Sequence, residues 1–142
     1  MEQDLLTKLS DHNLRKTPFR RRILQIFIES KGFALTHRDI EENLGDFDRI
    51  TLYRTLKSFE QHGLIHQVID GTGTPKYALC SDVCTEHNHR DVHAHFFCTD
   101  CEQTTCLEDI SVPEPNLSKG FRIHAAQLVL NGVCDVCTRA IN

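Results

Sequence analysis

Apolar residues recur at helical spacing in the first part of the chain and predict three consecutive helices. The first helix is expected to begin at Pro18 after an N-cap at Thr17. A threonine hydroxyl accepts a free backbone N–H at this position, and proline has no N–H to satisfy. The face that this helix is expected to bury consists of Ile23, Leu24, Phe27 and Ile28.

Capping residues mark the starts of two more helices. Thr36 with Asp39 three positions later is a variant of the capping box, and the short helix that follows is expected to end at Gly45. Asp48 can cap a third helix with the sequence ITLYRTLKSFEQH. Its buried face is expected to consist of Leu52, Leu56 and Phe59. Its polar face is expected to consist of Arg49, Thr51, Arg54, Thr55 and Ser58.

The pattern then changes to that of a β-hairpin, with LIHQVID and KYALC on either side of the glycine-rich stretch GTGTP. Three helices followed by a hairpin is the order of a winged helix-turn-helix, whose third helix enters the major groove of DNA. Tyr53 can contact thymine methyl groups, and Arg54 can reach a guanine edge or a phosphate. The alternative, that the third helix packs a core and its polar side is only solvated, stays open. The predicted DNA-contacting residues are Arg15, Lys16, Arg20, Arg21, Arg49, Thr51, Tyr53 and Arg54.

Charge and cysteine are unevenly distributed along the chain. Residues 1–66 hold 11 of the 16 Lys and Arg residues, whereas the remainder holds 5, against 10 acidic residues, and all seven cysteines. We therefore expect a DNA-binding domain at 1–80, a hinge at 81–92 and a metal-rich domain at 93–142. No apolar run is long enough for a transmembrane helix, and the acidic start is unlike a signal peptide, so a cytoplasmic location is expected.

Two Cys-x-x-Cys pairs, Cys98 with Cys101 and Cys134 with Cys137, are the strongest chemical signal in the chain. Two such pairs can place four thiolates tetrahedrally around Zn²⁺, and a site with no open position is structural rather than catalytic. An odd number of cysteines argues against a complete disulfide framework. A redox dithiol and free buried thiols remain as alternatives. The strands expected between the two pairs are TTCL at 104–107 and FRIHAAQLVL at 121–130.

The stretch HAHFFC, which ends at the first cysteine of the first pair, reads as a strand with alternating side chains. His93 and His95 then lie on one face and Cys98 on the other, so two metal sites are expected to meet back to back.

The hairpin can complete the second of these sites. If its loop is centred near Gly73, His66 lies directly across from Cys80, close enough to share a metal ion. The predicted regulatory set suits zinc and would join the two domains; it consists of His66, Cys80, His93 and His95.

The motif TLYRTL followed by HxHxxCxxC resembles the ferric uptake regulator family of metal-dependent bacterial repressors, and the resemblance covers nearly the whole chain. It implies an α+β fold: an N-terminal winged helix-turn-helix domain followed by a small α/β dimerisation domain with a four-cysteine zinc site. It also implies a homodimer that grips a palindromic double-stranded DNA operator when metal is bound. Tyr53 and Arg54 would then read DNA.

Departures from the family pattern favour its zinc uptake branch. Phe33 stands where iron and peroxide sensors carry a ligand histidine, and His37 is displaced from that place. His66 and Cys80 match the ligand positions of zinc uptake regulators. Zinc is therefore expected as structural and regulatory metal, with iron or manganese as alternatives at the regulatory site.

Other parts of the chain bear on further metal sites and on the dimer. Ligands of a third family site would fall near Val92, Ala94 and Ala126, which cannot coordinate a metal ion. The segment ISVPEPNLSKG is shorter and richer in proline than the usual helix of the dimerisation domain. The candidates for an additional metal site are Cys84, His87, His89 and Cys106.

Three other functions compete with the repressor. A zinc enzyme is disfavoured because neither HExxH nor a deaminase signature is present and a four-ligand site leaves no place for water. A thiol-based peroxide sensor would use an exposed cysteine such as Cys84. A zinc-ribbon interaction module would leave the helix that carries Tyr53 and Arg54 unexplained.

Overall fold

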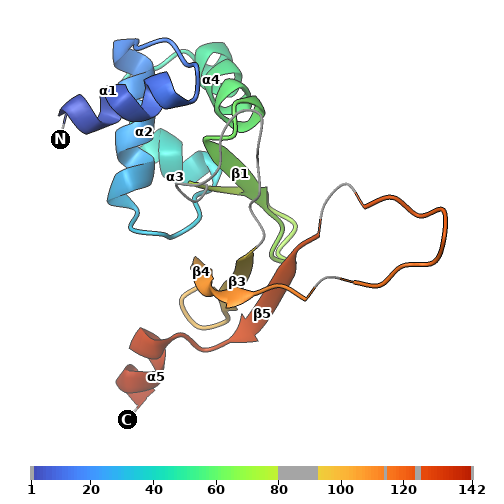
Figure 1. Cartoon of the computed structure of the whole chain (residues 1–142). Coiled ribbons are helices and arrows are strands. Elements are labelled where there is room, and N and C mark those ends of the chain that lie inside the picture. Colours follow the sequence, from blue (N-terminus) through green and yellow to red (C-terminus); the bar gives the residue numbers. More distant parts are fainter. Residues whose placement is uncertain (1, 80–92, 114, 124–125, 142) are drawn as a thin grey trace.

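The structure is a computed structural model that describes residues 2–79, 93–113, 115–123 and 126–141 (Figure 1). Helices gather at the N-terminal end, a hairpin lies beneath them, and a second sheet leads to the C-terminal helix. This mixture of helix and strand agrees with the predicted α+β class. The elements are α1 (Glu2–Asp11), α2 (Pro18–Glu29), α3 (His37–Glu42), α4 (Arg49–Gln61), β1 (Ile65–Val68), β2 (Lys76–Leu79), β3 (His93–Cys98), β4 (Thr104–Ser111), β5 (Leu128–Gly132) and α5 (Asp135–Ile141).

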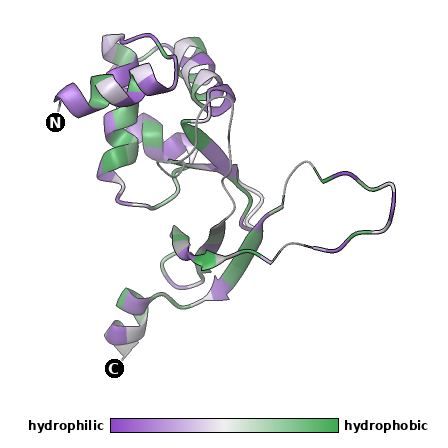
Figure 2. Cartoon of the chain, viewed as in Figure 1, coloured by the Kyte–Doolittle hydropathy of each residue, from purple (hydrophilic) through white to green (hydrophobic). Residues whose placement is uncertain are grey.

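One apolar core holds the N-terminal helices together. It joins α1, α2 and α4 to the start of β1, and Leu9, Phe27 and Phe59 are among its fully buried side chains. Figure 2 shows both hydrophobic and hydrophilic stretches on α2, as expected of an amphipathic helix with one solvated face. Helix α1 was not predicted from the sequence, although Leu5 and Leu9 are spaced to bury one side of it.

The predicted helix starts are confirmed by the cap contacts. The backbone N–H of Arg20 donates to the Thr17 hydroxyl at 3.2 Å, and Thr36 and Asp39 form a reciprocal capping box. Asp48 caps α4.

Three details of the predicted helices are wrong. The helix α3 ends at Glu42 with Asn43 as its C-cap, before Gly45. Ile28 is exposed, and Ile26 takes its place in the core. Thr55 is buried, and its hydroxyl donates to the backbone carbonyl of Thr51 at 2.8 Å, so it does not belong to the polar face of α4.

The strands β1 and β2 form the predicted antiparallel hairpin, but their register differs from the expected one. His66 pairs with Ala78, so the prediction that His66 lies directly across from Cys80 is wrong. The hairpin turns one residue earlier than assumed, which moves each partner by two positions. Because side chains alternate with a period of two, this shift keeps His66 on the expected face.

The second sheet has the strand order β4-β3-β5, with β3 antiparallel to β4 and parallel to β5. The strand β4 continues beyond the predicted TTCL. The strand β5 begins only at Leu128, so the expectation of a strand from Phe121 onward is wrong. The turn between β3 and β4 contains Cys101, which places the first cysteine pair at the tip of this hairpin.

A long connection runs from the end of β4 to β5 and projects from the body of the molecule (Figure 1). Among its described residues, 112–113, 115–123 and 126–127, none belongs to a helix or a strand. Prolines in this segment explain the missing helix, because proline lacks a backbone N–H and restricts the residue before it. In the part of the chain that the structure describes, no helix is long and apolar enough to cross a membrane.

Candidate metal centres and DNA-facing helix

The four cysteines of the two Cys-x-x-Cys pairs converge on one point. Their sulfur atoms all lie within 4.8 Å of one another. The Sγ atoms of Cys101 and Cys134 are 3.9 Å apart, close to the edge of about 3.8 Å for a tetrahedron with zinc–sulfur bonds. We name this set the four-cysteine cluster: Cys98, Cys101, Cys134 and Cys137.

Backbone N–H donors and neighbouring thiols shift the pKa values of thiols in the four-cysteine cluster. Cys98 Sγ accepts the N–H of Cys101 at 3.5 Å and that of Cys134 at 3.3 Å, and these donors lower the pKa of the Cys98 thiol to about 6. The neighbouring Cys134 side chain and burial raise the pKa of Cys137 to about 12. The four thiols therefore cannot all ionise together without a cation among them, and Zn²⁺ fits this donor set.

A second cluster of ligand atoms lies between the hairpin and the C-terminal sheet. His66 and His95 are 6% and 2% exposed, and their Nε2 atoms are 3.1 Å apart. Two imidazole nitrogens bound to one tetrahedral zinc ion would be separated by about 3.3 Å. The sulfur of Cys106 is within 4.8 Å of both. We name His66, His95 and Cys106 the junction cluster.

Strand pairing explains how the junction cluster is assembled. His95 on β3 is directly paired with Cys106 on β4. Directly paired residues of antiparallel strands have Cβ atoms about 4.5–5.5 Å apart. His66 comes from β1, in the hairpin that follows α4. The cluster therefore draws its ligands from both parts of the molecule.

The structure brings together two members of the predicted regulatory set, His66 and His95. The side chain of His93 and the whole of Cys80 lie outside the described residues. Cys106, predicted as a candidate for an additional site, lies instead beside His66 and His95. The other three candidates, Cys84, His87 and His89, also lie outside the described residues.

The two clusters share β3 but lie on different sides of it. His95 belongs to the junction cluster and Cys98, three positions later, to the four-cysteine cluster. An odd separation along a strand directs two side chains to opposite faces. This arrangement agrees with the expectation that the stretch 93–101 serves two separate groups of ligands.

The positions of other family ligands offer no coordinating atoms here. Ala94 is fully buried and Ala126 is exposed, and Val92 lies outside the described residues. Phe33 is 40% exposed and forms an isolated bridge with Thr105 of β4. His37 is the first residue of α3, and its ring centre is 4.8 Å from that of Tyr53.

One face of α4 presents the predicted DNA-contacting residues. Arg49, Thr51 and Arg54 are exposed, and 55% of Tyr53 is exposed. The hydroxyl of Thr51 donates to the capping carboxylate of Asp48 at 2.7 Å, which fixes the first turn of the helix.

The basic run before and within α2 is only partly available to a polyanion. Arg15 and Lys16 are exposed, whereas Arg20 is half-buried. Arg21 forms an ion pair with Glu2 of α1 at 2.6 Å. Helix α1, which the sequence analysis missed, therefore neutralises one of the predicted phosphate contacts.

Comparison with known proteins gives a consistent family and fold. The sequence model of the ferric uptake regulator family matches residues 11–131. The ferric uptake regulation protein of Synechococcus elongatus is 26% identical over 152 residues, which cover 96% of this chain and 95% of that protein.

Solved structures agree with this match. A zinc uptake regulator complexed with zinc and DNA is similar with a TM-score of 0.67 and 20% identity, covering 99% of this chain and 97% of that one. The ferric uptake regulator of Pseudomonas aeruginosa with manganese has a TM-score of 0.58 at 20% identity, covering 92% of this chain and 97% of that one. These likenesses establish the fold: a winged helix-turn-helix followed by a small α/β unit.

Proposed function

The chain belongs to the ferric uptake regulator family of metal-responsive regulators, and from this premise we propose that it is a zinc-responsive repressor. It would bind a palindromic operator as a homodimer when its regulatory site holds zinc. Family membership confirms the predicted resemblance and the prediction that the chain is a regulator rather than an enzyme.

The observation that carries the zinc assignment is the composition of the junction cluster. Two imidazole nitrogens 3.1 Å apart with a thiol beside them form a nitrogen and sulfur donor set. Thiolate and imidazole suit Zn²⁺, whereas Mn²⁺ prefers carboxylate and water oxygens. We propose His66, His95 and Cys106 as regulatory ligands, with either Cys80 or His93 as the fourth ligand of a tetrahedral site.

The four-cysteine cluster is proposed as a structural zinc site. Its sulfur geometry and the N–H donors to Cys98 support this role. Bound zinc would tie α5 to the tip of the β3–β4 hairpin, because Cys137 lies in α5 and Cys98 ends β3. Structural zinc of this kind contributes directly to folding.

The proposed DNA-reading element is α4. Its exposed residues Arg49, Tyr53 and Arg54 offer charge and an aromatic ring to a major groove. The same fold occurs in a zinc uptake regulator bound to DNA, which supports this assignment. Arg15 and Lys16 are proposed to contact backbone phosphates; Arg20 and Arg21 are less exposed. Such a repressor would act where the chromosome is, in the cytoplasm.

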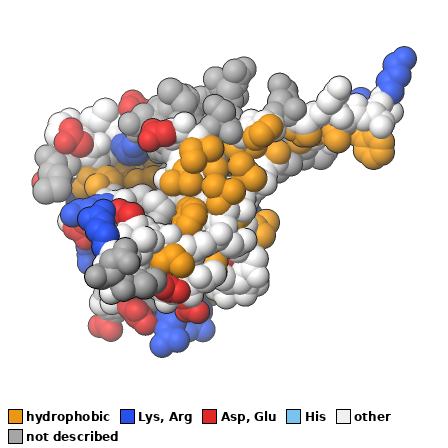
Figure 3. Space-filling model, turned by 90° about the horizontal axis from the view of Figure 1, so that it is seen from below, with side chains coloured by type: hydrophobic (Ala, Val, Ile, Leu, Met, Phe, Trp, Pro, Cys, Tyr) orange, Lys and Arg blue, Asp and Glu red, His pale blue; other side chains and the backbone are white. Residues whose placement is uncertain are grey.

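An exposed apolar surface supports the homodimer. Figure 3 shows hydrophobic side chains gathered at the centre of the lower face and along the projecting segment. Phe121 is 71% exposed, and Leu117 and Ile123 are each 48% exposed. Contiguous exposed apolar surface marks interaction sites in proteins. We propose that a second copy of the chain covers it.

The proposed mechanism is a shift in population between orientations of a DNA-binding domain (1–80) and a dimerisation domain (93–142), joined by residues 81–92. His66 on one side and His95 with Cys106 on the other converge when the two domains are closed. Ligand binding at this junction favours the closed orientation, which sets the spacing of the two α4 helices in the dimer. A DNA-competent state populated at only about 1% costs roughly 100-fold in apparent affinity.

Metal counting by mass spectrometry before and after mild chelation tests this proposal. We expect about two zinc ions per chain, one readily lost and one retained. Operator binding is then measured with added Zn²⁺, Fe²⁺ or Mn²⁺. The proposal is supported if Zn²⁺ tightens operator binding at a lower free concentration than Fe²⁺ or Mn²⁺ does. Equal or better tightening by Fe²⁺ or Mn²⁺ would replace it with an iron- or manganese-responsive regulator, and no response to any metal would contradict it.

A further inference from the structure

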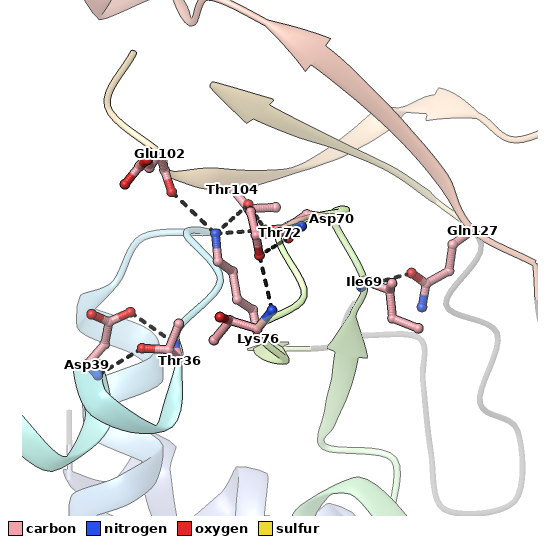
Figure 4. Close-up of polar contacts among 10 residues, drawn as sticks. Thr36, Asp39, Ile69, Asp70, Thr72, Lys76, Glu102, Thr104 and Gln127 are labelled. Carbon is pink, nitrogen blue, oxygen red and sulfur yellow. Dashed lines mark hydrogen bonds and ion pairs between the residues drawn. The ribbon is translucent and has the colours of Figure 1, made fainter. Parts of the chain in front are cut away.

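A buried group of charges lies where the hairpin meets the C-terminal sheet (Figure 4). The Lys76 ammonium is 2.7 Å from Asp70 Oδ2 and donates to the Thr104 hydroxyl at 3.0 Å. The Thr104 hydroxyl in turn donates to Asp70 Oδ2 at 2.7 Å. We name Asp70, Lys76 and Thr104 the junction triad.

The three side chains of the triad are buried, and the positive charge of Lys76 is paired with the negative charge of Asp70. Asp70 is 5%, Lys76 7% and Thr104 0% exposed. The second oxygen of Asp70 accepts the hydroxyl and the N–H of Thr72, at 2.6 and 3.1 Å. Burial opposes ionisation of Asp70, but Lys76 and the two threonine hydroxyls outweigh it and hold the pKa of this carboxyl far below its usual range.

The members of the triad come from both parts of the molecule. Asp70 and Lys76 flank the turn of the β1–β2 hairpin, whereas Thr104 begins β4. Lys76 also donates to the backbone carbonyl of Glu102 at 3.2 Å, and its ammonium lies 5.1 Å from the centre of the Phe97 ring. The ion pair itself lies within the hairpin, and the hydrogen bonds that Thr104 forms with both of its charged groups, together with that from Lys76 to Glu102, attach the hairpin to the sheet.

Backbone hydrogen bonds continue this attachment on one side. The segment 32–35 lies between β2 and β4. Its Ala34 N–H donates to the Thr104 carbonyl at 2.8 Å, and the Cys106 N–H donates to the Gly32 carbonyl at 3.2 Å. Leu35 and Tyr77 exchange two hydrogen bonds of 2.7 Å each. On the other side, the Gln127 side chain accepts the N–H of Ile69 at 3.1 Å (Figure 4). It also donates to the backbone carbonyl of Gln67 at 2.9 Å.

The triad and the junction cluster are neighbours on β4 and along the first half of the hairpin. Thr104 and Cys106 are two positions apart on β4, so their side chains share a face. Asp70 follows His66 by four residues, just past the end of β1. Fixing Asp70 and Lys76 against Thr104 therefore also fixes how closely His66 approaches His95.

We propose that the junction triad is a set of positioning residues that favours contact between the DNA-reading part of the chain and the C-terminal sheet independently of metal, and so raises the fraction of molecules whose junction cluster is assembled for its ion. This inference rests on the proposed function for its effect on operator binding. The claim that the triad favours contact between the two parts of the molecule does not depend on metal or DNA binding.

Preorganisation has a measurable consequence. If the triad favours the closed orientation, breaking it lowers the fraction of molecules that can bind zinc at the junction, and the apparent zinc affinity falls by the same factor. Operator affinity falls through the same equilibrium. The four-cysteine cluster, built entirely from C-terminal residues, keeps its metal.

Lys76→Met is the test, because it removes the ammonium but keeps a flexible apolar chain beside Phe97. The full-length protein is measured in three ways: amide hydrogen exchange at Ala34 and Cys106 at one buffered free zinc concentration that saturates the parent, affinity for Zn²⁺ by competition with a chelator, and operator binding at saturating zinc. Leu9→Ala, in the core of the N-terminal helices, is the matched control for lost stability. Should Lys76→Met not fold, Thr104→Val removes a single hydroxyl and takes its place.

We expect Lys76→Met to exchange the Ala34 and Cys106 amides at least tenfold faster and to bind the exchangeable zinc at least tenfold more weakly, with the tight zinc retained. Leu9→Ala should change neither quantity once global unfolding is subtracted. Amide exchange and zinc affinity within twofold of the parent would overturn the proposal. If the parent itself binds no exchangeable zinc, the proposed function fails, and the amide exchange alone decides whether the triad positions the two parts.

Discussion

The four-cysteine cluster and the junction cluster both bring together side chains that are able to bind a metal ion, but they are built in different ways. The four-cysteine cluster takes all its members from residues 98–137, and Cys101 is exposed at the tip of a hairpin. The junction cluster joins β1 to β3 and β4, and its two histidines are almost completely buried. A metal ion in the first would stabilise one unit of structure. A metal ion in the second would stabilise one arrangement of two units, which is what a sensor requires.

Removing a ligand of the four-cysteine cluster should have the largest effect. We expect Cys134→Ser to lose the tightly held zinc, to unfold the C-terminal sheet and to abolish the dimer, because structural zinc supplies much of the folding free energy of small domains. Metal counting, thermal unfolding and size measurement check this. Cys106→Ser is the matched control, since it removes a cysteine from the other cluster and should retain the tight zinc and the dimer. Equal loss of tight zinc in both variants would contradict the separation of the two clusters.

Removing a ligand of the junction cluster should leave the fold intact but abolish the effect of zinc on operator binding. For His95→Ala we expect loss of the exchangeable zinc and operator binding roughly 100-fold weaker at saturating zinc, because the closed orientation is no longer favoured. Fluorescence anisotropy with a labelled operator measures this.

The control for this variant is His12→Ala, which removes a buried imidazole that contacts the Lys8 carbonyl far from the junction. It should lower thermal stability while keeping the zinc response. A full zinc response in His95→Ala would show that the junction cluster is not the sensor.

A change on α4 should weaken DNA binding without touching either cluster. We expect Tyr53→Ala to bind the operator about tenfold more weakly and to bind zinc normally, since one base contact contributes about 1–3 kcal/mol. The same variant should no longer distinguish thymine from uracil in the operator. If parent and variant bind the thymine and uracil operators with equal affinity, Tyr53 does not contact DNA.

Acid should weaken the contact between the two parts through Asp70. The folded-state pKa of Asp70 is depressed from its ordinary value of 3.8, so its contribution to stability is present above that value and is lost as the pH falls below it. The stability of Asp70→Asn should therefore change less than that of the parent between pH 5 and pH 3. Denaturant unfolding of the metal-free proteins at both pH values measures the difference. Parallel pH profiles would show that Asp70 titrates alike in folded and unfolded chains.

The local features of this fold could be predicted because they depend on neighbouring residues. The caps at Thr17, Thr36 and Asp48 need only short-range geometry. The two Cys-x-x-Cys pairs are far apart in the chain, but the repeated motif predicts that they share one ion and therefore converge. Helix α1 was missed because only Leu5 and Leu9 mark its buried side, and its packing partner lies in α2.

The composition of the junction cluster depends on strand register, which the sequence determines less directly. An error of one residue in the centre of the β1–β2 turn moved the expected partner of His66 by two positions. The place of Cys106 could have been found by treating Cys98-x-x-Cys101 as the tip of a hairpin. That hairpin pairs Phe97 with Thr104 and hence His95 with Cys106. The junction triad carries no motif, because Thr104 joins Asp70 and Lys76 only when the hairpin meets the sheet.

The decisive experiment measures operator affinity over a range of buffered free zinc, on protein that has lost only its exchangeable metal. We expect the affinity to rise by roughly 100-fold as one zinc ion per chain binds, while the tightly held zinc stays in place. Operator affinity that stays constant within twofold over the same range would contradict a zinc-responsive junction between the DNA-reading helices and the C-terminal sheet.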